Sequence, residues 1–170
     1  TMWSAGLAQR GAALERAVGQ PPSEETVEAC TLAVLRHGAT ITAVELLEGY
    51  GDCNAVGRAI GTFFDDVDAL VLPSVAGPTW KLGELDQDDP AAGVDGWVRT
   101  LFEEYVPFTA MFNITGQPAI SLPLAWTEDG LPVGVQLVGR FGEEATLLRL
   151  AVQLEQMFPW AERVPPVAVA

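Results

Sequence analysis

The chain has 170 residues, of which 49% are apolar and 19% are charged. This composition is typical of a folded domain and lies far from that of disordered chains. The formal net charge is -14, and the 9 basic residues are too few to form a cationic face among 23 acidic ones. Neither nucleic acid nor an anionic membrane surface is therefore an expected partner.

Cysteine use and the absence of sorting signals predict a cytoplasmic protein. Cys30 and Cys53 match no metal or disulfide spacing and are expected to be reduced. The first residues lack the basic and apolar regions of a signal peptide. No apolar run is long enough to cross a bilayer as a helix.

The chain begins with two predicted helices. The first is expected over Ser4–Val18 and ends before Pro21, because proline cannot continue a helix. Ser23 is the expected cap of the second helix, which ends at Gly38.

A long third helix and a short strand follow. Thr42 and Glu45 form a capping-box pattern, which predicts a helix that begins there and continues to about Phe64. The apolar run Ala69–Leu72 predicts a strand that is buried on both faces of a sheet.

The second half of the chain combines a loop, a helix, a hairpin and a closing helix. A loop is expected over Ser74–Gly96 and a helix over Trp97–Tyr105. Alternating residues predict strands over Ala119–Leu124 and Val133–Val138, joined as a hairpin. The chain is therefore expected to form one segment with a helical part at 1–64, strands and loops at 65–141, a closing helix at 142–158 and a tail at 159–170.

The sequence contains no complete set of residues for acyl transfer. The single histidine, His37, lies at a predicted helix C-terminus, where an imidazolium favours the helix dipole, so a structural role is expected. The single lysine, Lys81, lies in a polar loop, and no serine sits in a glycine-rich turn that could form an oxyanion hole. No metal site, calcium loop, nucleotide-binding motif or other cofactor site is predicted.

Two strings in the second half resemble motifs of the amidase signature family. Residues Phe112–Pro123, FNITGQPAISLP, resemble the family stretch N-x-(T/A)-G-x-P-A-x-S-x-P. Residues Asp129–Gly139, DGLPVGVQLVG, look like its D-G-L-P-x-G-x-Q-x-x-G, and Phe64–Ser74 is similar to the strand that precedes the family's long loop. The order and spacing of these strings are specific to the family. Their residues look closest to those of the 6-aminohexanoate-cyclic-dimer hydrolase branch.

The resemblance implies a fold, an activity and a missing part. The implied fold is α/β, with a mixed twisted sheet covered by helices, of which this chain is the C-terminal part. The implied activity is hydrolysis of a carboxamide C–N bond in a small-molecule amide by two serines and a lysine. Those residues belong to a glycine- and serine-rich stretch in the family's N-terminal half, which this sequence lacks. No catalytic residue is therefore assigned, and the chain alone is expected to be inactive.

Several residues are candidates for contacts with substrate or with another segment. Thr79 and Trp80, in the long loop, are the expected wall of a substrate pocket, because functional residues favour loops on rigid scaffolds. Asn113 is a third candidate, although it also suits a turn. Gly134 suggests close approach of other backbone or ordinary packing, and Gln136 is expected to need a buried hydrogen-bond partner.

Three hypotheses for function remain open. The first is an amidase C-terminal segment whose partner is the N-terminal segment, with a homo-oligomer as a further arrangement. The second is a non-catalytic interaction module derived from the amidase fold. The third is a hydrolase that uses Ser121 or Ser74. The reading frame upstream discriminates between the first two.

Overall fold

The computed structural model describes residues 1–89 and 91–164. Their contacts divide the chain into two compact units. One unit comprises Thr1–Ala55 with Gly77–Tyr105, and the other comprises Val56–Ala76 with the described residues from Val106 onward. Both units combine segments that are distant in sequence, so neither is a simple N- or C-terminal half.

The first unit is helical. It contains α1 (Met2–Val18), α2 (Ala29–Gly38), α4 (Gly93–Val98) and the π-helix η1 (Arg99–Tyr105). Its core joins α2 to α4, where the buried side chains are Cys30, Val34 and Trp97. Gly38 allows α1 and α2 to pack closely, because a Cβ at this position would collide with the backbone carbonyl of Ser4.

Helix α3 (Ala43–Phe63) runs from the first unit into the second. The predicted capping box is present at its start. The Glu45 carboxylate accepts a hydrogen bond from the Thr42 N–H at 2.8 Å, and the Thr42 hydroxyl accepts one from the Glu45 N–H at 3.2 Å. Each residue therefore satisfies a backbone donor of the other, as helix starts require.

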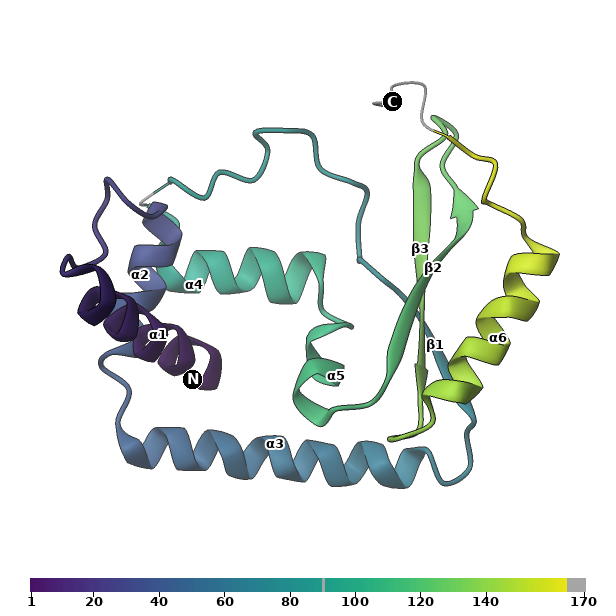
Figure 1. Cartoon of the computed structure of the whole chain (residues 1–170), viewed down its shortest axis with the longest axis horizontal. Helices are drawn as coiled ribbons and strands as arrows, with labels where there is room; N and C mark the ends of the chain where they lie inside the picture. The colour runs from purple at the N-terminus through teal and green to yellow at the C-terminus, as the bar shows by residue number, and fades with distance from the viewer. Residues whose placement is uncertain (90, 165–170) are drawn as a thin grey trace. The chain divides into compact units, whose positions relative to one another are not determined.

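The second unit contains a three-stranded antiparallel sheet in the order β1-β3-β2 (Figure 1). Its strands are β1 (Ala69–Pro73), β2 (Ala119–Trp126) and β3 (Pro132–Gly139). The predicted hairpin is confirmed as β2 and β3, with Ser121 opposite Gln136 and Ala119 opposite Val138. On the other side of β3, Leu72 is opposite Gln136.

Different helices pack against the two faces of this sheet. Because side chains alternate along a strand, Leu122 and Leu137 point to one face, where they pack against Leu147 and Ala151 of α6 (Glu144–Met157). Val138 points to the other face and packs against Phe64 and Phe112, the latter from α5 (Ala110–Thr115). Helices α5 and α6 accordingly lie on opposite sides of the sheet (Figure 1). The fold is thus mixed α/β, as the sequence predicted.

Two local predictions were wrong. The strand Ala69–Pro73 lies at the edge of the three-stranded sheet and is not buried on both faces, since Val71 is 61% exposed. Ser23 does not cap α2, which begins six residues later at Ala29. Ser23 instead lies in a turn of its own, in which its N–H donates to the Thr26 hydroxyl at 2.9 Å and its own hydroxyl accepts from the Glu25 N–H at 3.4 Å. Short hydroxyl side chains compete with helix formation in this way.

The described residues include no single helix that is long and apolar enough to cross a membrane. Helices α2 and α3 meet the length and composition criteria only when taken together, and they are bent by 103° at their junction.

Candidate functional site

Two serine hydroxyls meet at one end of the sheet. Ser74 follows β1, and its N–H donates a hydrogen bond to the carbonyl of Gly134 at 3.0 Å, which extends the pairing of β1 with β3. Ser121 lies in β2, on the other side of β3. The two Oγ atoms are 2.5 Å apart, so the hydroxyls are hydrogen-bonded to each other across the central strand.

Gly134 makes this meeting possible. A Cβ built at Gly134 would lie 2.7 Å from Ser74 Oγ, 2.9 Å from Ser74 Cβ and 3.1 Å from Ser121 Oγ. The space that a larger residue would need is therefore filled by the two serine side chains. Of the two interpretations of Gly134, the structure shows packing inside this chain, because the groups nearest to it are the side chains of Ser74 and Ser121.

Gln136 is the next residue of β3 on the same face. Its side chain is buried, with 6% of its surface exposed, and its Nε2 has no hydrogen-bond partner among the described residues. The sequence predicted that Gln136 needs a partner, and no such partner lies within the part of the chain that the structure describes. Gln117 Oε1 is a second buried atom without a partner there. Such atoms are uncommon in folded proteins, so each requires an explanation.

The serine pair has donors and acceptors but no base. A serine nucleophile needs a neighbouring group that takes its proton. Within the described residues, the hydrogen bonds of Ser74 and Ser121 side chains join only each other. The Arg140 guanidinium of the same unit is occupied, because its Nε donates to the Phe64 carbonyl at 3.0 Å. This arrangement supports hydrogen bonding to a ligand or a neighbouring segment, and it offers no activation of the serine.

The predicted pocket residues Thr79 and Trp80 lie in the loop of the first unit, as expected. Thr79 is exposed. Trp80 is half-buried because its ring stacks on Tyr105, with centroids 4.0 Å apart and planes 20° apart. Tyr105 is the last residue of the π-helix, and the sequence did not single it out. A stacked aromatic pair is a suitable wall for an apolar ligand.

The third candidate, Asn113, belongs to the second unit. It is exposed and lies within α5, so the expected turn is not formed at this residue. The helix ends three residues later, where Gly116 adopts a left-handed conformation with φ 79°. Nothing in its surroundings joins Asn113 to the serine pair by a hydrogen bond.

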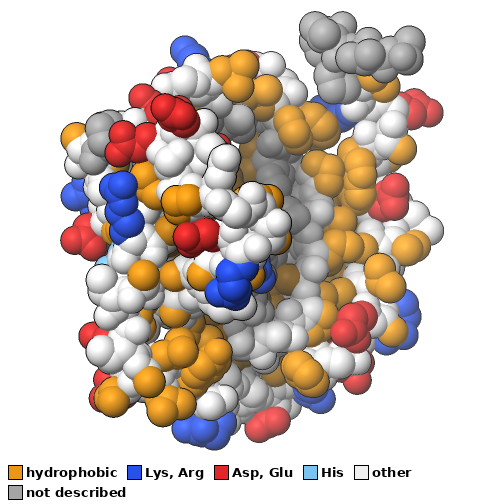
Figure 2. All heavy atoms as spheres, turned by 60° about the vertical axis from the view of Figure 1, so that its left-hand side comes forward, with side chains coloured by type: hydrophobic (Ala, Val, Ile, Leu, Met, Phe, Trp, Pro, Cys, Tyr) orange, Lys and Arg blue, Asp and Glu red, His pale blue; other side chains and the backbone are white. Residues whose placement is uncertain are grey.

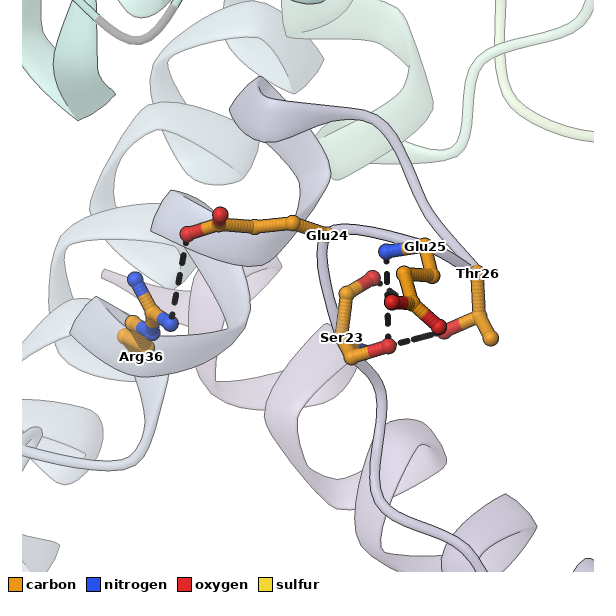
Figure 3. A network of polar contacts seen from close by, with 5 residues as sticks. All are labelled: Ser23, Glu24, Glu25, Thr26 and Arg36. Atoms are coloured by element: carbon orange, nitrogen blue, oxygen red, sulfur yellow. Dashed lines mark hydrogen bonds and ion pairs between the residues drawn. The ribbon is translucent and has the colours of Figure 1, made fainter.

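A network of polar contacts joins the segment before α2 to Arg36 within that helix (Figure 3). Arg36 and Glu24 approach to 4.0 Å, and their side chains are 70% and 80% exposed, so the pair adds little stability. Arg36 also lines an apolar pocket of about 270 Å³ between α1 and α2. No group of three His, Cys, Asp or Glu side chains in the described chain could hold a metal ion.

A comparison with protein families identifies the chain. The Amidase family model matches residues 3–148. The chain belongs to the amidase family. The match includes the serine pair, Gly134 and Gln136, so the site described above lies within the residues that the family model covers.

Individual amidase relatives agree with this assignment. A putative amidase AmiB2 from Mycobacterium bovis is 37% identical over 146 residues, which cover 85% of this chain and 30% of that relative. A 6-aminohexanoate-cyclic-dimer hydrolase from a Pseudomonas species is 32% identical, over 87% of this chain and 31% of its own length. A putative amidase AmiC from Mycobacterium leprae is 44% identical over 61% of this chain and 21% of its own length.

The amidase fold is also found among solved structures. The structure of a 6-aminohexanoate cyclic dimer hydrolase matches with a TM-score of 0.86 and 29% identity, over 96% of this chain and 34% of that one. The crystal structure of another amidase matches with a TM-score of 0.70 and 26% identity, over 91% of this chain. This chain therefore spans about one third of the length of the amidases that it matches.

Proposed function

We propose that this chain is the C-terminal part of an amidase that hydrolyses a carboxamide C–N bond. In this proposal two serines and a lysine base, supplied by an N-terminal segment, perform the acyl transfer, and one of the serines is the nucleophile. The serine oxygen attacks the amide carbonyl, the amine leaves with a proton, and water releases the acid from the acyl-enzyme. The observation that carries the proposal is the family match over residues 3–148 in a chain about one third as long as its relatives.

The serine pair supports a non-catalytic role for this part of the enzyme. Ser74 and Ser121 have no base among their hydrogen-bond partners in the described residues. Lys81, the single lysine, is exposed in the loop of the first unit. The chain would then contribute walls and packing surfaces, such as the Trp80–Tyr105 pair, to a site completed elsewhere.

The substrate in this proposal is a small linear or cyclic amide. The relatives named above include hydrolases of the 6-aminohexanoate cyclic dimer. An apolar cyclic amide of this kind would fit the stacked aromatic wall formed by Trp80 and Tyr105.

The test is an assay of amine release from the 6-aminohexanoate cyclic dimer and from short linear amides. The purified chain should stay at background, and activity should appear when the segment encoded upstream of residue 1 is produced separately and added. A translation start at Met2, with no amidase segment encoded nearby, would favour the alternative, a stand-alone interaction module. Turnover by the chain alone that is lost in Ser121→Ala would instead establish it as a hydrolase in its own right.

A further inference from the structure

At the end of the sheet that carries the serines, there are more hydrogen-bond donors than acceptors bound to them among the described residues. Ser74 and Ser121 hold two hydroxyl hydrogens, and their mutual bond uses one of them. Gln136 Nε2 brings two further hydrogens and has no acceptor among the described residues. All three side chains point to the same face, because Ser121 is opposite Gln136 and Ser74 follows Leu72 by two residues.

The apolar cluster that covers this face does not extend to the serines. The apolar cluster around Val138 includes Phe64 and Phe112 and extends along β1 to Leu72. It does not include Ser74, Ser121 or Gly134, and Ser121 is exposed. The Ser121 hydroxyl is therefore open beside this cluster, whereas Gln136 next to it is buried.

We infer that Ser74, Ser121, Gly134 and Gln136 form a docking patch for a main-chain carbonyl oxygen of the N-terminal amidase segment. We call these four residues the serine–glutamine patch. This inference rests on the proposed function, because the occupant is the segment that would supply the remaining two thirds of the relatives' length.

The chemistry of the serine–glutamine patch favours a carbonyl oxygen. Its free donors are neutral, so they match a neutral amide acceptor without the cost of desolvating a charge. Gly134 lets the two serine side chains lie over the central strand, and Ser121 is exposed, so the backbone of another segment can reach its hydroxyl. Nε2 is covered in this chain, and the terminal torsion of glutamine is soft, so its amide can turn towards an incoming acceptor.

The experiment measures the affinity of the chain for the separately produced upstream segment, and the melting temperature of the chain alone. Gln136→Met keeps the length of the side chain and removes the donors. We expect it to weaken binding about tenfold, which corresponds to about 1.4 kcal/mol. The melting temperature of the isolated chain should stay unchanged or rise, because a buried donor without an acceptor has been removed. Gln153→Met, the same change on the exposed side of α6, should alter neither quantity.

The outcomes separate this inference from the proposed function. If the wild-type chain does not bind the segment, the proposed function is overturned. If it binds and Gln136→Met binds equally well, the docking patch alone is overturned. A lower melting temperature of isolated Gln136→Met would also contradict it, because Gln136 would then have a partner inside this chain.

A second variant covers the case in which Gln136→Met fails to fold. Ser121→Ala removes an exposed hydroxyl and should weaken segment binding several-fold while the isolated chain stays folded. Equal binding by this variant would count against the patch. Saturable binding of the cyclic dimer to the isolated chain, lost in Gln136→Met, would assign these donors to substrate and overturn the inference.

Discussion

At the scale of single residues, Gly134 decides how the polar end of the sheet is built. Its missing side chain leaves the space that Ser74 and Ser121 occupy, and their hydroxyls bond across the strand at 2.5 Å. The same residue therefore controls both the packing and the chemistry of this end of the sheet. A change at Gly134 should disturb both.

Gly134→Val should destabilise the fold by about 1–3 kcal/mol, because the new side chain would overlap Ser74 and Ser121. Thermal melting of the purified chain measures this loss. The double variant Gly134→Ala with Ser74→Gly should be more stable than Gly134→Ala alone, since removing the Ser74 side chain relieves the closest contact. An unchanged melting temperature in Gly134→Val would show that the serines can move away freely.

At the scale of secondary-structure elements, two glycines within helices have opposite roles. Gly51 lies within α3, and a Cβ there would meet no atom within 4 Å. Gly38 lies at the end of α2, where a Cβ would collide with the backbone of Ser4. The first glycine weakens a helix, and the second holds two helices together.

Gly51→Ala should therefore stabilise the chain by roughly 0.5–1 kcal/mol, because alanine loses less backbone entropy in a helix. Gly38→Ala is the matched substitution and should lower the melting temperature instead. Denaturant unfolding of the two variants gives both free energies. The interpretation fails if the two substitutions change stability in the same direction.

The capping box at the start of α3 should make the free energy of unfolding depend on pH. The pKa of Glu45 lies below its ordinary value of 4.5, chiefly because the Thr42 N–H and then the Thr42 hydroxyl donate to its carboxylate. A lowered carboxyl pKa adds stability that is present above the unfolded pKa and is lost as the pH falls through the folded pKa. The capping box should thus weaken in the region below pH 4.5.

Thr42→Ala should lower the melting temperature at pH 7, and the difference from the wild-type chain should shrink as the pH falls below 4.5. Melting curves at a series of pH values measure the difference. Thr42→Ser keeps the hydroxyl and should behave like the wild-type chain. A difference that stays constant into acid would show that the Glu45 charge adds nothing to the cap.

At the scale of the whole molecule, the described surface carries many large apolar side chains. Figure 2 shows them in groups between acidic and basic side chains on the visible face. On α3 none of the residues is buried, and the exposed apolar residues there include Val44, Leu47 and Tyr50. Large exposed apolar areas are uncommon in monomers and typical of interaction surfaces.

The isolated chain should therefore associate more strongly as salt rises. Its net charge of -14 opposes contact between copies, and this repulsion is screened beyond about 8 Å at physiological salt. Light scattering at low and high salt measures the change in mass. A compact monomer that binds no hydrophobic dye at either salt would contradict this expectation and would favour the stand-alone module.

The sequence by itself determined the family, the hairpin and the capping box. Each depends on residues that are close in the chain, such as the alternation in β2 and β3 or the pair Thr42 and Glu45. Only the tertiary structure decided that β1 lies at an edge, that Ser74 meets Ser121, and that Trp80 stacks on Tyr105. The two side-chain contacts join residues that are 47 and 25 positions apart in the sequence. Local propensity and periodicity carry no information about such pairings, which depend on how β1 and the loop after it fold back on later parts of the chain.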